Sequence, residues 1–279
     1  MELEKDNLLT VISNKVKELE EKKKSFDRID YKINEYNNSE NSELAFLCHE
    51  CKGKGLIAYR SNNDLAFRKC SCYNRLNSFK KLKRLGLSHV VKDAGDIKDL
   101  PENEEWERRT KMIIMDYLKN HNYEYSIYIG GQSGSGKTTK GTQIIKYLIS
   151  ETIEESKVLT FEYFSWDTRW RELVFDNDRY ALIKALQETD ILFLDDFFRH
   201  TNLKISDAEK EVAKQVLDWR YTNKMQTIIT SELYLKEIIQ LDEALGSRIK
   251  EMCDYNKYAI NIARDSSRNY RLKIDNSLI

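Results

Sequence analysis

Apolar residues recur along this chain with two different periods, and these periods predict where helices and strands lie. Near the start they repeat at helical spacing between charged residues, which predicts a helix over residues 3–36. The apolar positions are Leu8, Val11, Ile12, Val16 and Leu19. This apolar stripe packs either on the rest of its own protein or on a partner. The polar run 37–42 then predicts a linker.

Short apolar runs alternate with amphipathic stretches over the rest of the chain. The apolar runs predict strands over residues 126–129, 158–161, 191–196, 227–230 and 258–262. The amphipathic stretches predict helices over residues 73–85, 104–119, 138–149, 170–175, 180–187 and 207–221. Strands that alternate with helices predict an α/β fold, in which helices cover both faces of a parallel sheet.

A glycine-rich segment between the first of these strands and its helix carries the clearest chemistry. Gly131 to Thr138 reads GQSGSGKT and fits the phosphate-binding pattern G-x-x-x-x-G-K-[ST], the P-loop. Backbone N–H groups of such a loop converge on phosphate oxygens, and the helix N-terminus adds a partial positive charge. The predicted residues for binding ATP or ADP are Gly131, Ser133, Gly134, Ser135, Gly136, Lys137, Thr138 and Thr139. We expect Lys137 to reach the β- and γ-phosphates and Thr138 to bind Mg²⁺.

Two adjacent acids end an apolar strand downstream of the P-loop. We expect Asp195 to hold Mg²⁺, directly or through water, and Asp196 to polarise the water that attacks the γ-phosphate. A glutamate is commoner at the second position, and an aspartate is one methylene shorter. The sequence therefore leaves the rate of hydrolysis open, although nucleotide binding does not depend on this difference.

Four cysteines form two pairs in the first third of the chain, Cys48-x2-Cys51 and Cys70-x-Cys72. The residues between the pairs predict an antiparallel hairpin, which would bring the pairs together. Four thiolates at about 2.3 Å satisfy tetrahedral zinc, so the sequence predicts a structural Zn²⁺ site. We expect the neighbouring His49 to lie outside the ligand set. Cys253 stands alone and is expected to be an ordinary, partly buried thiol.

Composition narrows the class of protein. The chain is 41% hydrophobic with a mean hydropathy of −0.66, and no apolar run is long enough to span a bilayer. Its start lacks the features of a secretory signal, so we expect a cytoplasmic protein without a membrane partner. Formal net charge is zero, yet residues 48–92 hold eleven Lys and Arg against two acids. That segment meets an anionic partner such as nucleic acid, or it is a solvated lysine-rich face.

The order of these motifs is similar to that in the bacterial replicative-helicase loaders, the DnaC/DnaI branch of the AAA+ ATPases, which also includes the IstB transposition helpers. The resemblance covers roughly residues 85–275. Its motifs are the P-loop, Asp195-Asp196, Trp219-Arg220-Tyr221, Thr227 to Ser231, Leu245 to Ile249, and Asn269 to Leu272. The cysteine module resembles the N-terminal region of Gram-positive and phage-encoded loaders and is absent from the IstB type. The compact size and divergent sensor also fit a phage-encoded protein.

The resemblance implies roles for further residues. Arg248 matches the arginine finger, which reaches the nucleotide of a neighbouring subunit, and Arg248 is expected to lie between two helices. Arg271 matches the second sensor, with Arg264 and Arg268 as nearby competitors. Ser231 falls at the first sensor, where the family has a Ser/Thr-Asn pair. The next residue, Glu232, departs from that pattern and would place a negative charge near the γ-phosphate.

The resemblance implies an ATP-dependent loader that delivers a hexameric DnaB-type replicative helicase onto single-stranded DNA and assembles through its AAA+ domains. The expected domains are an N-terminal helical segment (1–44), a zinc module that contacts the helicase (45–85) and an AAA+ ATPase domain (86–279). The basic zinc module could instead bind DNA. Other hypotheses are an IstB-like regulator of transposition, a small-molecule kinase, and an ATP-binding interaction module with weak or no hydrolysis.

Overall fold

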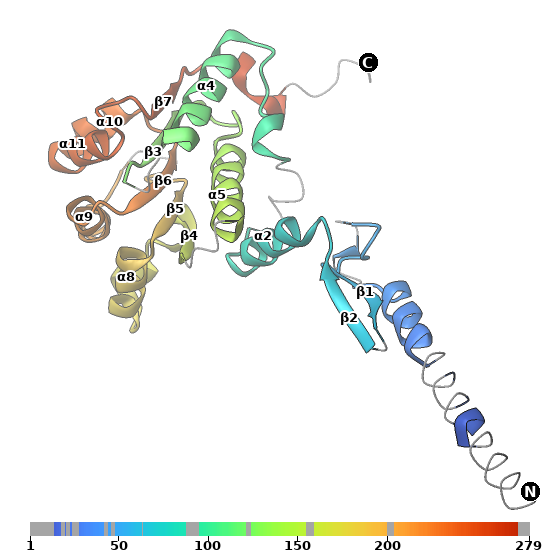
Figure 1. Cartoon of the computed structure of the whole chain (residues 1–279). Coiled ribbons are helices and arrows are strands. Elements are labelled where there is room, and N and C mark those ends of the chain that lie inside the picture. The colour runs from blue at the N-terminus through green and yellow to red at the C-terminus, as the bar shows by residue number, and fades with distance from the viewer. Residues whose placement is uncertain are drawn as a thin grey trace, which may run out of the picture. The chain divides into compact units, whose positions relative to one another are not determined.

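The structure of the chain is a computed structural model. It describes residues 14–17, 20, 23, 28–41, 44–45, 48–62, 64–87, 95–120, 124–154, 159–199 and 204–272. The chain divides into two units, residues 1–77 and 78–279, which we call the N-terminal and C-terminal units. Helix α2 (Tyr73–Arg84), drawn in teal in Figure 1, contains the boundary between them.

The N-terminal unit contains a helix and a hairpin. The predicted helix over 3–36 lies partly outside the described residues, and the described part is helical, including all of 28–38. The hairpin pairs β1 (Leu56–Ser61) with β2 (Asp64–Lys69) in antiparallel register, as predicted. The predicted linker starts too early, because the helix continues through Asn37, whose side-chain amide exchanges two hydrogen bonds with the backbone of Ala58.

The C-terminal unit is built on a parallel sheet of five strands, in the order β4-β5-β6-β3-β7. The strands are β3 (Ile127–Gly131), β4 (Phe161–Ser165), β5 (Ile191–Asp195), β6 (Gln226–Ser231) and β7 (Ala259–Ile262). Because β6 lies between β3 and β5, the carboxyl ends of these three strands meet at one edge. The predicted α/β fold, in which a P-loop follows a strand of a parallel sheet, is confirmed.

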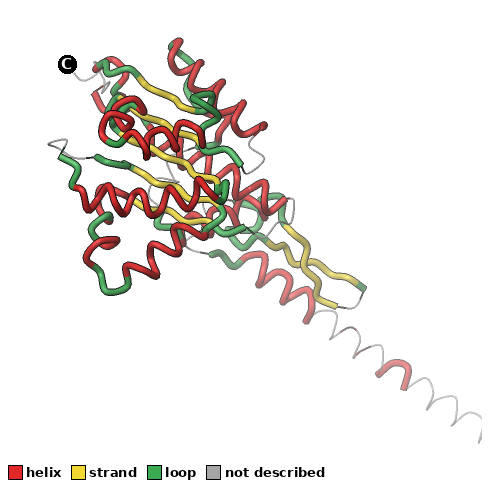
Figure 2. Tube along the Cα trace, turned by 90° about the vertical axis from the view of Figure 1, so that its left-hand side faces the viewer, coloured by secondary structure: helices red, strands yellow, loops and turns green. Residues whose placement is uncertain are grey.

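Helices cover both faces of this sheet. The longer ones are α4 (Glu105–Asn120), α5 (Lys137–Glu154), α8 (Arg179–Glu188), α9 (Asp207–Thr222), α10 (Leu235–Leu241) and α11 (Glu243–Met252). Short turns of helix complete the unit: α6 (Trp166–Arg169), α7 (Glu172–Phe175), and the 3-10 turns η2 (Ile97–Asp99), η3 (Ser266–Arg268) and η4 (Tyr270–Leu272). Figure 1 shows α5 on one side of the strands and α9, α10 and α11 on the other. In Figure 2 the yellow strands of this sheet run side by side among the red helices.

The three central strands of the sheet are buried on both faces. Every residue of β3, β5 and β6 is buried, as expected for a parallel sheet between helical layers. The strand predicted over 158–161 is displaced, since β4 begins only at Phe161. The reason is a side-chain contact: Asp190 accepts hydrogen bonds from the backbone and hydroxyl of Thr160 and holds that residue outside the strand.

A fully buried arginine ties α9 to the sheet. The guanidinium of Arg220 donates to the hydroxyl of Thr227 and to backbone carbonyl groups. These carbonyls belong to Leu186, Gln187, Thr189, Asp190 and Gln226. Buried carbonyl groups need donors, so one side chain satisfies the end of α8 and the entry to β6 together.

In the described residues, no helix combines the length and apolar character needed to cross a bilayer.

Replacing Arg220 with Ala is expected to lower the free energy of unfolding of the C-terminal unit by about 3–5 kcal/mol, because it leaves several buried carbonyl groups without a donor. Chemical denaturation followed by tryptophan fluorescence measures this change, since all four tryptophans lie in that unit. The control, Lys184→Ala, removes an exposed lysine of α8 and should change the free energy by less than about 0.5 kcal/mol. Equal effects of the two variants would contradict the role given to Arg220.

Candidate functional site

The P-loop joins the end of β3 to the start of α5, and its shape depends on glycine at two places. Gly131 has φ +107°, and a Cβ there would lie 2.0 Å from the carbonyl oxygen of Ile262. Gly134 has φ +71°, and its Cβ would lie 1.9 Å from the side-chain oxygen of Asn269. Any larger residue would therefore push β7 or the C-terminal segment away from the loop.

A cavity of about 230 Å³ opens beside this loop. Its lining includes the predicted residues Ser133, Gly134, Gly136, Lys137, Thr138, Thr139, Asp196 and Arg271. Three further residues complete the lining: Arg199, Glu232 and Tyr270. The structure thus brings the P-loop, the acid after β5 and the C-terminal arginine to one hollow. Gly131 lies on a neighbouring cavity that Arg199 and Glu232 also line.

Lys137 is folded back onto the loop that it belongs to. Its ammonium donates to the carbonyl oxygens of Gly131 (3.0 Å) and Gln132 (2.8 Å). Burial lowers the pKa of Lys137, and the carboxylates of Glu232 and Asp196 oppose this effect. Ser135 donates its hydroxyl to the Gln132 carbonyl, 2.8 Å away, so it shapes the loop from within. The ammonium is therefore held against the backbone carbonyls of its own loop.

Thr138 and Asp195, the two residues predicted to hold Mg²⁺, are in direct contact. The Thr138 hydroxyl donates to Asp195 Oδ1 over 2.9 Å. Thr230 also donates to Oδ1, and the Tyr163 hydroxyl lies 3.2 Å from Oδ2. Burial raises the pKa of Asp195 above its usual value, and these hydrogen bonds offset only part of that rise. Hydroxyl and carboxylate oxygens are the ligands that Mg²⁺ prefers, so the two side chains fit this ion.

Asp196 begins a tight turn instead of continuing the strand. Its φ is +52°, and its N–H donates to the Thr230 hydroxyl over 3.1 Å. Its carboxylate lies 2.9 Å from a guanidinium nitrogen of Arg199, and another nitrogen of the same group lies 3.4 Å from Glu232. Sequence reasoning missed Arg199. Its spacing of three residues from Asp196, together with the unexpected acid at 232, was the available signal.

The predicted first-sensor serine has a structural contact instead of facing the cavity. Ser231 is fully buried, and its hydroxyl donates to the Phe197 carbonyl over 2.6 Å. The same hydroxyl accepts from the backbone of Leu233. Ser231 therefore fixes the turn after Asp195, whereas the next residue, Glu232, turns toward the phosphate cavity.

The C-terminal segment lies directly on the P-loop. The N–H of Tyr270 donates to the Gly134 carbonyl over 2.9 Å, and Arg271 follows at the rim of the cavity. The competitors for the second-sensor position have other contacts. Arg268 stacks over the Trp106 ring, and Arg264 pairs with Glu237 on α10. The geometry thus favours Arg271 over both.

Arg248 lies away from this cavity, on α11. The expectation that it lies between two helices is wrong, because Asp242 caps α11 ahead of it and the helix runs through to Met252. Its guanidinium lies 3.0 Å from Asp218 on α9. An arginine finger acts on the nucleotide of a neighbouring subunit. A position of Arg248 outside the cavity of the same chain is therefore compatible with the predicted role.

A comparison with protein families agrees with this geometry. Residues 107–278, which contain the P-loop, both acids and the C-terminal arginines, match the family model Novel STAND NTPase 3 (nSTAND3). The chain belongs to the nSTAND3 family. Membership in an NTPase family is thus established by the sequence of residues 107–278.

Curated relatives of this nSTAND3 protein come from Bacillus subtilis (strain 168). Over 242 residues the chain is 30% identical to the phage-like element PBSX protein XkdC, covering 78% of this chain and 84% of XkdC. It is 38% identical over 152 residues to the uncharacterized protein YqaM, covering 53% of this chain and 46% of YqaM. The chain therefore belongs to one family with XkdC, and the expected link to phage-encoded proteins is confirmed.

Solved structures that match this nSTAND3 protein include DnaI and the DnaC helicase loader. A crystal structure of DnaI matches with 16% identity and a TM-score of 0.49, over 65% of this chain and 92% of that chain. One of the DnaC helicase loader matches with 22% identity and a TM-score of 0.43, over 60% and 94%.

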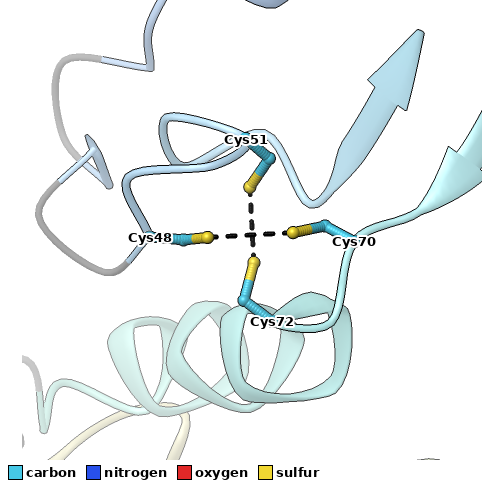
Figure 3. Close-up of side chains that lie close together, drawn as sticks. All are labelled: Cys48, Cys51, Cys70 and Cys72. Carbon is cyan, nitrogen blue, oxygen red and sulfur yellow. Dashed lines mark hydrogen bonds between the residues drawn. The ribbon is translucent and has the colours of Figure 1, made fainter. Parts of the chain in front are cut away.

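The cysteine pairs lie outside the range matched by the family model and form a second candidate site. Figure 3 shows the side chains of Cys48, Cys51, Cys70 and Cys72 pointing toward one centre. Their sulfur atoms all lie within 4.8 Å of one another, with Cys48–Cys70 at 3.7 Å and Cys51–Cys72 at 3.3 Å. Sulfurs about 2.3 Å from a tetrahedral ion would be roughly 3.8 Å apart. The four thiols therefore fit Zn²⁺.

The neighbours of these cysteines agree with a metal centre. Burial raises the pKa of Cys51, but hydrogen bonds from the Gly55 N–H and from the other thiols outweigh it and lower that pKa to about 7. The adjacent His49 is exposed, in line with its expected place outside the ligand set. Cys253, expected to be partly buried, is fully buried in the C-terminal unit.

Metal analysis of the purified protein is expected to find about one zinc ion per chain. Cys51→Ser should abolish that zinc, because a hydroxyl is a poor ligand for this ion. The matched control is Cys253→Ala, which removes a thiol outside the cluster and should leave the zinc content unchanged. A folded protein without zinc, or equal zinc in all three samples, would contradict the assignment.

Proposed function

We propose that the chain is an ATP-dependent loader of a hexameric DnaB-type replicative helicase onto single-stranded DNA. The observation that carries the ATPase part is the contact between Thr138 and Asp195 beside the buried ammonium of Lys137. The loader part rests on the order of the motifs along the chain and on the four-cysteine cluster, which the IstB type lacks. The cluster therefore favours a loader over a regulator of transposition.

The residues of the site have distinct roles in nucleotide binding. The backbone amides from Gly131 to Thr138 surround the phosphates, and Lys137 leaves its own loop carbonyls to reach the β- and γ-phosphates. The Thr138 hydroxyl and the Asp195 carboxylate hold Mg²⁺, which would neutralise phosphate charge. Asp196 orients the attacking water. Arg271 approaches the phosphates from the same subunit, and Arg248 approaches those of a neighbouring subunit.

The modules divide the work of loading. The N-terminal segment over 1–44 and the zinc module over 45–85 bind the helicase, and the AAA+ domain over 86–279 binds single-stranded DNA. ATP at subunit boundaries joins the AAA+ domains. Hydrolysis then weakens these boundaries and releases the loader, because the γ-phosphate no longer bridges the lysine of one subunit and the arginine of the next.

A second candidate, an ATP-binding interaction module with weak hydrolysis, is favoured by one specific observation. The Asp196 carboxylate is paired with Arg199, which also faces Glu232. A carboxylate in an ion pair polarises water less well than a free one. Hydrolysis measured with saturating ATP separates this candidate from the loader, which must turn over when single-stranded DNA is present.

Lys137→Ala is expected to abolish detectable binding of ATP, because the ammonium is the main positive charge within the P-loop. Calorimetric titration with ATP in the presence of Mg²⁺ measures the affinity. The control Lys184→Ala removes an exposed lysine of α8 and should bind ATP like the wild type. Wild-type affinity in Lys137→Ala would show that the P-loop assignment is wrong.

The wild-type protein with ATP and Mg²⁺ is expected to capture a purified hexameric replicative helicase in a pull-down. Cys51→Ser should lose this capture while it still binds ATP, because the zinc module and the nucleotide site lie in different units. Retained ATP binding shows that the C-terminal unit of the variant is folded. Failure of the wild type to capture any replicative helicase from its host would remove the loader proposal and leave the ATPase intact.

A further inference from the structure

Arg199 occupies a place in the nucleotide cavity that none of the predicted motifs explains. Its guanidinium lies between two acids, at 2.9 Å from Asp196 and 3.4 Å from Glu232. All three side chains line the cavity that also holds Lys137 and Arg271. A single arginine therefore faces both acidic side chains of the cavity lining.

The turn that carries Arg199 is held in place by packing. Asp196 and Phe198 have φ values of +52° and +54°, a region that bulky residues seldom adopt. Phe197 and Phe198 are buried and stacked with ring centres 4.1 Å apart, and Trp166 lies 4.9 Å from Phe197. Such strain persists only where surrounding contacts enforce it, and it clusters at functional sites. Here it brings Arg199 back over Asp196.

The charges of the cavity explain why an arginine is needed there. Asp196 and Glu232 both face the space that the phosphates of a nucleotide would enter, and each would repel them. While the site holds no γ-phosphate, the positive charge of Arg199 neutralises part of the negative charge of these two carboxylates. A guanidinium also forms paired hydrogen bonds with phosphate oxygens, so a γ-phosphate would compete directly with the two carboxylates for Arg199.

We propose that Arg199 senses the γ-phosphate within its own subunit. Without a γ-phosphate, Arg199 pairs with Asp196 and Glu232. When a nucleoside triphosphate binds, the guanidinium turns to the γ-phosphate and leaves the Asp196 carboxylate free to accept a hydrogen bond from water. Glu232 is a positioning residue that holds Arg199 in the cavity. This inference rests on the proposed nucleotide site and is distinct from the roles given to Arg248 and Arg271.

The test compares the affinities of the full-length protein for a non-hydrolysable ATP analogue and for ADP, both with Mg²⁺. Arg199→Ala is expected to weaken binding of the analogue at least about tenfold more than binding of ADP, because only the analogue carries the γ-phosphate. Arg199→Lys keeps the charge and most of the side-chain length, so it should fall between Arg199→Ala and the wild type. The control Arg171→Ala removes an exposed arginine outside the cavity and should leave both affinities unchanged.

Glu232→Gln provides a second and opposite change. It removes the negative charge that competes with the γ-phosphate for Arg199 but keeps an amide oxygen that can still hold the guanidinium in the cavity, so the preference for the analogue over ADP should rise severalfold. A merely structural role for Arg199 would weaken both nucleotides alike. Equal changes for the two nucleotides in Arg199→Ala, or none, would overturn the inference if Lys137→Ala abolishes binding in the same assay. Wild-type affinities in Lys137→Ala would instead show that the nucleotide site itself is wrong.

Discussion

The hydrogen bond between Thr138 and Asp195 joins the P-loop to the end of β5, and it depends on the order of the strands in the sheet. Thr138 lies in the first turn of α5, the helix that follows β3, and Asp195 is the last residue of β5. Their side chains meet at 2.9 Å only because β6 lies between β3 and β5 in parallel register. Thr230 of that middle strand completes the contact by donating to the same carboxylate oxygen. The contact between Thr138 and Asp195 is thus set by strand order.

Keeping that strand order requires that the polar groups at the opposite ends of the strands are satisfied as well. Arg220 does this at the end of the sheet where β6 begins, where its guanidinium serves the hydroxyl of Thr227 and the surrounding carbonyl groups. A side chain that looks like a surface residue in an amphipathic helix is therefore part of the core. The sheet therefore has the buried guanidinium of Arg220 at the end where β6 begins, and a cluster of charged side chains at the end where β3, β5 and β6 stop.

The sequence predicted the elements of the second unit well, because strong apolar periodicity and the P-loop leave few alternatives. The errors have local causes. The strand at β4 is displaced because Asp190 binds Thr160, a contact between residues thirty apart that periodicity cannot reveal. Arg248 lies within α11 because Asp242 caps that helix six residues ahead of it, a boundary that the sequence analysis did not place. The cysteine cluster was predictable from spacing, since hairpin geometry brings such pairs together.

The contacts of Arg199 could not be predicted for a different reason. Its pairing depends on a turn in which Asp196 and Phe198 adopt positive φ, and a phenylalanine seldom adopts that conformation. Glu232 looked like a charge in the wrong place when it was considered alone. In the structure it has a cationic partner 3.4 Å away, so the two unexpected residues explain each other. Departures from a family pattern are therefore more informative in pairs than singly.

The P-loop is itself shaped by segments far away in the chain. Tyr270 donates its N–H to Gly134, and its hydroxyl donates to Glu107 of α4 over 2.6 Å. Asp265 donates its N–H to the side chain of Gln132. If a bound nucleotide changes the shape of the P-loop, it also strains these bonds, so the free energy of binding includes a contribution from the C-terminal segment. Tyr270 thus links the P-loop both to the C-terminal segment and to α4, and the affinity of the site for a nucleotide depends on these distant segments as well as on the loop.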